Sequence, residues 1–272
     1  MHARSIVAGS LMAATIALPA GVSARPRPRF EPTDLEWEST GVFEVDVEFG
    51  LIRGPASGRL MIPDFELNFG ILDNVELDLD GSYALESTVP GSFSFDRPVP
   101  SSLWPSVKVG IYDDHDPETQ RARAIGVQVG PRIPIASGAH GLGFESLVVF
   151  GGSRRGLSVA LNLGAFVEPP TDAVSRYSLG VDAGIDLELA LDSHDRFQLT
   201  GELGGSYFLT ADPNQLHTTA GITWTVSPNL DLSVVGIVGI LPGDDRYGVL
   251  VGFEPKLRLF DAPPVRDKQD HQ

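Results

Sequence analysis

The sequence alternates apolar and polar residues with a period of two from about residue 42 to residue 260. In the first run, residues 42–49, apolar side chains take the odd positions from Phe43 and acidic side chains take the even positions from Glu44. The two sets are Phe43, Val45, Val47 and Phe49, and Glu44, Asp46 and Glu48. A strand points successive side chains to opposite faces, whereas a helix would scatter these acids around its surface. The run therefore predicts a strand with one apolar and one acidic face.

The same alternation returns along the chain and gives about twelve predicted strands. The clearest run, Tyr177–Leu191, alternates eight apolar positions with glycine, serine, aspartate and glutamate. The further runs span residues 65–69, 75–85, 107–111, 125–129, 144–150, 157–164, 197–208, 216–226, 230–240 and 247–260. An even number of strands is what single-chain bacterial barrels require.

The connections between these runs alternate in length. Short turns are predicted at residues 72–74, 152–155, 192–195 and 227–229, and longer loops at 50–58, 86–102, 132–141, 168–176 and 210–215. Outer-membrane barrels place short turns in the periplasm and long loops outside the cell. Residues 113–121 are an exception, because this connection should be short and yet spans about nine residues.

A soluble β-sandwich would also alternate, but its solvent face usually carries many charged side chains of both signs. Here one face is almost free of charge, and the other is small and polar with carboxylates. Aromatic residues gather near strand ends, where interfacial girdles lie. We therefore predict an all-β fold, a single antiparallel transmembrane β-barrel of about 12 strands over residues 41–260.

The two ends of the chain differ from the barrel region. Residues 1–24 have a basic start, an apolar run and a small-residue end, which is typical of a secretory signal peptide. The alternative of an uncleaved anchor requires about 20 apolar residues, more than the run of about 13 provides. Residues 25–40 are interpreted as a proline-rich, extended periplasmic lead, and residues 261–272 as a disordered polar tail. Export by the general secretory route to a Gram-negative bacterial outer membrane follows from this reading.

The formal net charge of −16 and the absence of cysteine narrow the possible functions. A chain this acidic lacks the clustered lysine and arginine that bind phosphates, so no nucleic-acid partner is expected. Without disulfides, an exported protein needs close packing or a closed hydrogen-bonded sheet. No cofactor or metal is expected. The expected partners are outer-membrane lipid, small solutes and, in transit, the barrel-assembly machinery.

The acidic face of the strands is the main candidate for function. The predicted lumen-facing acids are Glu44, Asp46, Glu48, Glu66, Glu76, Asp78, Asp80, Asp182, Asp186 and Glu188. The predicted lumen-facing bases are Lys108, Lys256 and Arg258. Crowded carboxylates repel one another unless bases or bound cations compensate them. Two readings stay open: a cation-favouring lumen, or a hydrated, pair-balanced interior that conducts nothing.

Two other features could carry chemistry. His217 shares a face with three threonines and could serve a membrane hydrolase, yet no motif ties a serine or an acid to it. Residues 113–118 hold four acids, but they lack the spacing of a calcium-binding loop and are better explained as a solvated acidic turn. We therefore predict no catalytic residues.

Three short motifs resemble the MetA-pathway phenol-degradation family of outer-membrane proteins. They are the hairpin of residues 65–79, the strand Pro105–Gly110 with its lysine, and the strand Gly126–Pro134 that ends in a proline-bearing loop. The resemblance implies a barrel of about twelve strands labelled as a transporter of small, including aromatic, molecules. The C-terminus departs from the usual barrel ending, because twelve residues follow Phe260 and both Lys256 and Arg258 share its face.

The function predicted from the sequence is passive diffusion or uptake of small solutes, hydrophobic or aromatic ones among them, across the outer membrane. The alternative is a non-conducting structural or adhesive barrel whose extracellular loops, chiefly residues 86–102, bind partners. A membrane hydrolase that uses His217 ranks last.

Overall fold

The computed structural model describes residues 29, 31–55, 57–87, 94–100, 102–116, 119, 121–135, 140–170, 175–194 and 196–260. The predicted signal peptide and C-terminal tail lie outside the described residues. The strands are β1 (Val42–Arg53), β2 (Gly58–Leu72), β3 (Val75–Ser87), β4 (Phe95–Pro100), β5 (Ser102–Asp116), β6 (Arg121–Pro134), β7 (Gly143–Arg154), β8 (Leu157–Glu168), β9 (Ser178–Ala190), β10 (Phe197–Phe208), β11 (Gln215–Ser227), β12 (Leu230–Gly239) and β13 (Tyr247–Arg258). Within the described ranges, no helix is long and apolar enough to cross a membrane.

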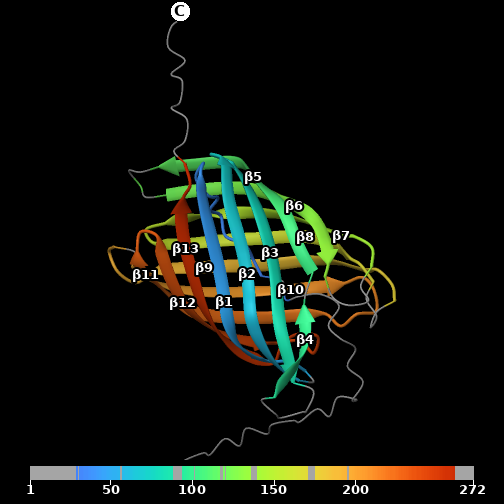
Figure 1. Cartoon of the computed structure of the whole chain (residues 1–272). Helices are drawn as coiled ribbons and strands as arrows, with labels where there is room; N and C mark the ends of the chain where they lie inside the picture. Colours follow the sequence, from blue (N-terminus) through green and yellow to red (C-terminus); the bar gives the residue numbers. More distant parts are fainter. Residues whose placement is uncertain are drawn as a thin grey trace, which may run out of the picture.

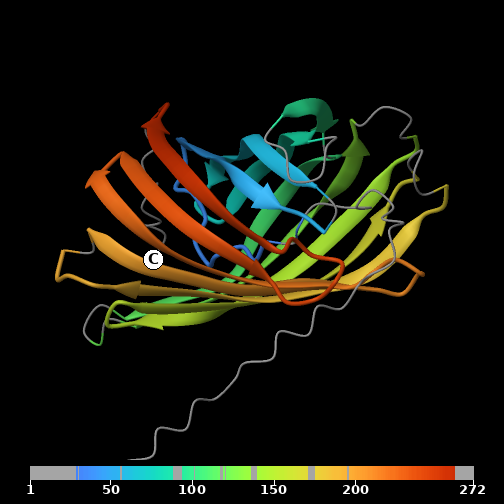
Figure 2. The same ribbon diagram turned by 90° about the horizontal axis from the view of Figure 1, so that it is seen from below.

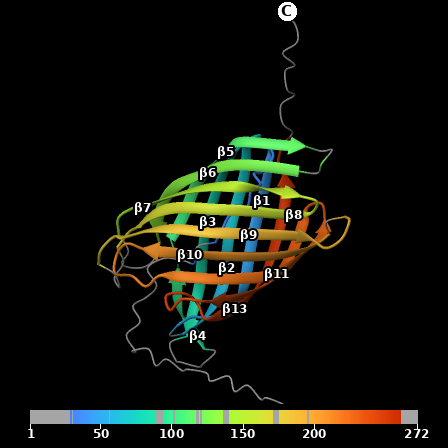
Figure 3. The same ribbon diagram turned by 180° about the vertical axis from the view of Figure 1, so that it is seen from behind.

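The strands form a closed antiparallel barrel (Figures 1 and 3). The twelve long strands pair with their neighbours, and β1 pairs with β13 from Val42↔Arg258 to Arg53↔Tyr247, which closes the wall. Closure gives each of the twelve long strands a partner on both sides, as a sheet in lipid requires, and only the short β4 pairs on one side, with β3. The predicted all-β barrel of about twelve strands is confirmed.

Two predicted connections are wrong in detail. Residues 86–102 were expected to form one long loop, but they contain β4, which pairs with the last part of β3 while β5 pairs with its first part. The connection predicted at 113–121 shortens to residues 117–120, because β5 and β6 remain paired out to Asp116↔Arg121. The charged residues at the end of β5 are exposed strand residues, and their charge gave the appearance of a loop.

The outer wall of the barrel is apolar and the inner wall is polar. Outward-facing side chains such as Leu163, Val234 and Val249 are more than half exposed. Inward-facing positions include the buried polar residues Asn162 on β8 and Gln128 on β6. This is the arrangement of a barrel that faces hydrocarbon outside and polar groups inside.

The expected periplasmic lead is corrected for residues 31–40, which lie inside the barrel and which we call the luminal segment (Figure 2). Thr33 exchanges two hydrogen bonds with inward-facing Asn162 on β8, at 3.2 Å and 2.8 Å. At its other end, Thr40 Oγ1 donates to Asp73 Oδ1 in the short β2–β3 turn at 2.6 Å. An extended chain has no internal hydrogen bonds, so the polar wall supplies partners for its backbone.

Candidate functional site: the barrel lumen

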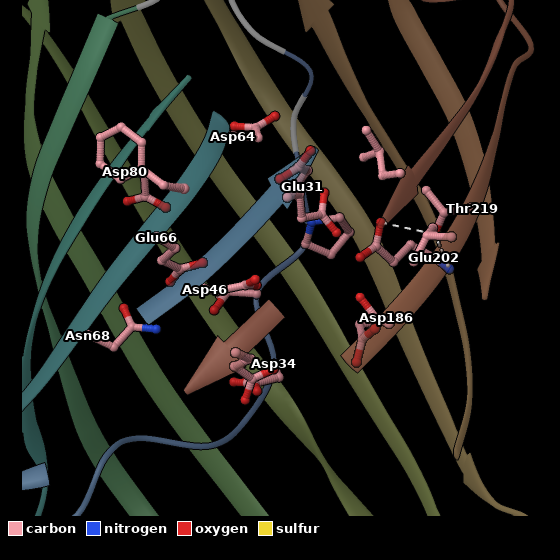
Figure 4. Close-up of a pocket in the computed structure, with 18 of the residues that line it drawn as sticks. Glu31, Asp34, Asp46, Asp64, Glu66, Asn68, Asp80, Asp186, Glu202 and Thr219 are labelled. Atoms are coloured by element: carbon pink, nitrogen blue, oxygen red, sulfur yellow. Dashed lines mark hydrogen bonds between the residues drawn. The ribbon is translucent and has the colours of Figure 1, made fainter. Parts of the chain in front are cut away.

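The luminal segment and the inner wall enclose a cavity of about 420 Å³. Its lining comes from strands on opposite sides of the barrel, and the segment crosses the space between them. Figure 4 shows Glu66 and Asp80 on one wall, Asp186 and Glu202 on the facing wall, and Asp34 of the segment between them. Glycines of the wall permit close approach of the segment: a Cβ at Gly70 would collide with the carbonyl oxygens of Glu38 and Ser39, and one at Gly110 would lie 2.7 Å from the ring of Trp37.

The lumen is strongly acidic. Among the described residues, eighteen aspartate and glutamate side chains line the cavity, against five lysine and arginine side chains. The predicted residues that line it are Glu44, Asp46, Glu48, Glu66, Glu76, Asp80, Asp186, Glu188, Lys108 and Lys256. Glu31, Asp34, Glu36 and Glu38 of the luminal segment add four acids. The segment therefore brings further negative charge into an already acidic space.

Three predicted residues do not line this cavity. Asp78 is buried in the wall, where its Oδ2 accepts hydrogen bonds from Gln128 Nε2 at 2.9 Å and from Ser106 Oγ at 3.2 Å. Asp182 is fully buried and accepts a hydrogen bond from Ser206 Oγ at 2.7 Å. Arg258 is exposed at the end of β13.

Other lining residues were missed by the sequence reasoning. They are Asp64, Glu145, Glu202, Asp231, Asp245, Glu254, Arg29, Arg59 and Arg132, besides the segment itself. Glu202 and Glu254 occupy inward positions of runs already predicted as strands, so a strict odd-even assignment would have found both. Asp245 lies in a loop, where no period-two pattern applies.

Two lysines connect the wall to the luminal segment. Lys108 Nζ lies 3.3 Å from Asp34 Oδ1 of the segment and 3.7 Å from Glu76 Oε1 of the wall. Lys256 Nζ lies 3.7 Å from Glu38 Oε1 and also pairs with Glu44 of β1. Hydrogen bonds and ion pairs, and no covalent bond, thus hold the segment against the wall.

The connection between β12 and β13 folds back onto the barrel wall, at the end of the barrel where the longer loops lie. His217 is fully buried, and its Nδ1 lies 2.8 Å from Asp244 Oδ2 of that connection. Asp245 forms an ion pair with Arg59 at the start of β2. A Cβ at Gly239 would collide with the carbonyl oxygen of Asp245, so glycine permits this close packing. The histidine–aspartate pair holds the loop against the wall, and a substrate has no access to the buried imidazole.

The acidic run of residues 113–118 begins as an exposed end of β5, with Asp113 and Asp114 paired to β6. In the part of the chain that the structure describes, no group of three or more histidine, cysteine, aspartate or glutamate residues could hold a metal ion.

Comparison with known proteins shows which solved structures have a similar fold. No protein-family model matches the chain, and no curated protein matches it. The crystal structure of the COG4313 outer membrane channel from Pseudomonas putida F1 is similar, with a TM-score of 0.57 and 10% identity over 84% of this chain and 100% of that chain. The NanC porin is also similar, with a TM-score of 0.53 and 12% identity over 78% of this chain and 100% of that chain. The chain has the fold of an outer-membrane β-barrel.

Proposed function

We propose that this protein is a channel of the Gram-negative outer membrane through which small solutes diffuse passively, with cations favoured. The observation that carries the proposal is the excess of carboxylates around a luminal cavity. The names of the two similar structures, a channel and a porin, support it. The apolar outer wall would contact membrane lipid, and the chain would be a relative of the MetA-pathway phenol-degradation family.

The preference for cations follows from the charge of the lumen. Carboxylates that lack a base lower the potential inside a narrow, low-dielectric wall, so cations concentrate there and anions are excluded. Passage also requires weak binding, because a pore that holds its solute tightly cannot release it. A lining of many dispersed carboxylates provides attraction without a single tight site.

The luminal segment would set the size of the passage. It occupies the space between Asn162 on one wall and Glu76 on another, and its Glu38 N–H donates to Glu76 Oε2. With the segment seated, only small ions and molecules would pass. With the segment displaced, the full width of the barrel would be available.

A non-conducting structural barrel is the second candidate, and the occupied lumen favours it. The two candidates differ in one measurement, because only a channel gives single-channel currents in a planar bilayer. No enzymatic activity is proposed, since His217 is shut away from the lumen and paired with Asp244.

A cross-link of the luminal segment tests the proposal. The chain has no cysteine, so Thr33→Cys with Asn162→Cys introduces a single possible disulfide between the segment and the wall. Under reducing conditions we expect larger or more frequent currents than in the oxidised protein. Thr33→Cys alone should not respond to oxidation. Silent bilayers with the reduced variant and with a variant that lacks residues 31–38 would refute a channel function.

A further inference from the structure

The last part of β5 has a neighbouring strand on one side only. Its pairing with β3 ends at Val75↔Val109, whereas its pairing with β6 continues to Asp116↔Arg121. Within the described part of the chain, no strand pairs with the other edge of residues 111–115, which we call the open edge. Figures 1 and 3 show this end of β5 at the rim of the barrel. The open edge therefore presents backbone N–H and C=O groups to which a further strand can bind.

A β-bulge separates the open edge from the rest of β5. The register with β6 shifts between Gly110 and Tyr112, so Ile111 is the extra residue. Ile111 is 65% exposed and Tyr112 is 46% exposed, and charged residues follow them. Lipid offers no hydrogen-bond partner to a backbone, so an edge beside the apolar band is more stable when a further strand covers it.

The pairing of β5 with β6 shows which side chains suit this stretch. Asp114 lies opposite Arg123, and Asp116 lies opposite Arg121. Opposite charges on directly opposed residues stabilise a sheet, and like charges destabilise it. A strand added to the open edge should therefore carry bases two positions apart. The same edge of a second copy would instead bring acids against acids, which disfavours pairing between two barrels here.

The C-terminal tail, residues 261–272, lies outside the described residues and has this pattern of bases. Arg266 and Lys268 are two positions apart, so both point to one face of an extended chain. The tail starts close to the open edge, because the ring of Phe260 packs against that of Phe69 on β2 at 6.0 Å between centroids. The place beside the open edge continues the line of β3, which is the neighbour of β2 at one strand spacing of about 4.8 Å. Six extended residues reach about 20 Å, so Arg266 can arrive there.

We propose that residues 267–270 of the tail add to the open edge as an antiparallel strand and so cap the rim of the barrel. In this register the opposed polar side chains are complementary: Asp267 with His115, Lys268 with Asp114, and Gln269 with Asp113. Arg266 then lies beside Asp116 at the end of β5. A parallel strand is disfavoured, because it would place Pro264 opposite Tyr112, and proline has no N–H to donate. Such a cap keeps the edge from pairing with other chains, and it is independent of any current through the lumen.

A disulfide tests the position of the tail, because the chain contains no cysteine. The variant Tyr112→Cys with Asp270→Cys places two thiols directly opposite each other in the proposed register. The matched control is Ile125→Cys with Asp270→Cys, since Ile125 is the partner of Tyr112 on β6 and is 40% exposed. Position 125 lies two strand spacings, about 10 Å, from the added strand, which is too far for a disulfide. With the folded protein in lipid nanodiscs, mild oxidation should therefore link position 270 to position 112 and not to position 125.

Two outcomes of this experiment would contradict the cap. Equal yields of the two disulfides would overturn the pairing, because a tail that β5 does not hold meets both positions. A disulfide between two chains, seen as a dimer on a non-reducing gel, would assign the edge to a second copy and overturn the tail as its occupant.

Charge substitutions in the tail test the choice of partner without touching the barrel. In the protein with Tyr112→Cys and Asp270→Cys, Arg266→Asp with Lys268→Asp should slow disulfide formation about tenfold, because attractive pairs become repulsive. Arg266→Lys with Lys268→Arg keeps both charges and should leave the rate unchanged. A rate that does not respond to the loss of these charges would overturn the pairing with the acidic edge.

Hydrogen exchange tests the backbone of the open edge. The amides of residues 111–115 should exchange slowly in the full chain and faster in a chain that ends after Phe260, because the added strand is then missing. The amides of residues 187–189 are the control, because they lie at the same end of the barrel in β9 and pair with strands on both sides. Exchange at residues 111–115 that is the same in both chains would overturn the tail as the cover of this edge.

Discussion

Lys108 joins the wall to the luminal segment, and its removal gives a quantitative test of the site. It is 4% exposed, and its ammonium group lies between Asp34 of the segment and Glu76 of β3, which is 1% exposed. Lys108→Met keeps most of the volume of the side chain and removes its charge. Glu76 is then left buried without its cation, and Asp34 loses its link to the wall.

The expected effect is large because the pair is buried. Removing one partner of a buried ion pair destabilises a protein by about 3–5 kcal/mol, since the remaining charge is uncompensated. Replacing both partners is far milder. Lys108→Met combined with Glu76→Gln should therefore recover most of the loss, because the introduced amide is neutral and its oxygen can still accept the N–H of Glu38.

Denaturant unfolding of the membrane-inserted protein measures this effect, with folded and unfolded barrels separated by their gel mobility. Arg196→Met is the control, because Arg196 is 62% exposed and its ion pair with Asp192 at 3.5 Å lies at the surface. The control should unfold with the wild type, as surface ion pairs contribute little. A Lys108→Met protein that is as stable as the control, or a double variant that is no better than the single one, would refute the reasoning.

Three further predictions follow from the lumen and from the loop packed against its wall. Asp186→Asn with Glu188→Gln should lower the cation-to-anion permeability ratio obtained from reversal potentials, whereas Asp182→Asn, outside the cavity lining, should leave it unchanged. Gly110→Ala should displace the tryptophan ring of the luminal segment and raise the open probability; an unchanged current would show that the ring does not anchor the segment. His217→Ala should lower the free energy of unfolding, measured by denaturant titration, by about 2–4 kcal/mol, because the buried carboxylate of Asp244 loses the hydrogen bond from the imidazole.

The strands could be read from the sequence because their pattern is local. Side chains alternate along one strand whatever the rest of the chain does, so the run Tyr177–Leu191 gave β9 (Ser178–Ala190) nearly to the residue. The same parity placed Glu66 and Asp186 on the inner wall, where they face the cavity. The strand β4 could not be predicted from alternation, because its six residues include two prolines and do not alternate between apolar and polar.

The luminal segment could not be read in this way. Its residues show neither the helical period of 3.6 nor the strand period of two. The hydrogen bonds that hold Thr33 join it to Asn162, 129 positions away. A proline-rich acidic stretch has the same composition in the periplasm as in a lumen. The burial of His217 was equally unpredictable. Its position in the alternating pattern placed it on the inner face, but its burial depends on Asp244 in the connection between β12 and β13.

The charge of the luminal segment bears on how firmly the barrel holds it. Glu31, Asp34, Glu36 and Glu38 enter a wall that already carries an excess of carboxylates, so general repulsion opposes seating. The opposing attraction comes from local contacts at Lys108 and Lys256. If the proposed channel opens by displacement of the segment, a few short-range contacts against a diffuse repulsion would let small changes release it. The acidity that would draw cations into the lumen would then also favour this release.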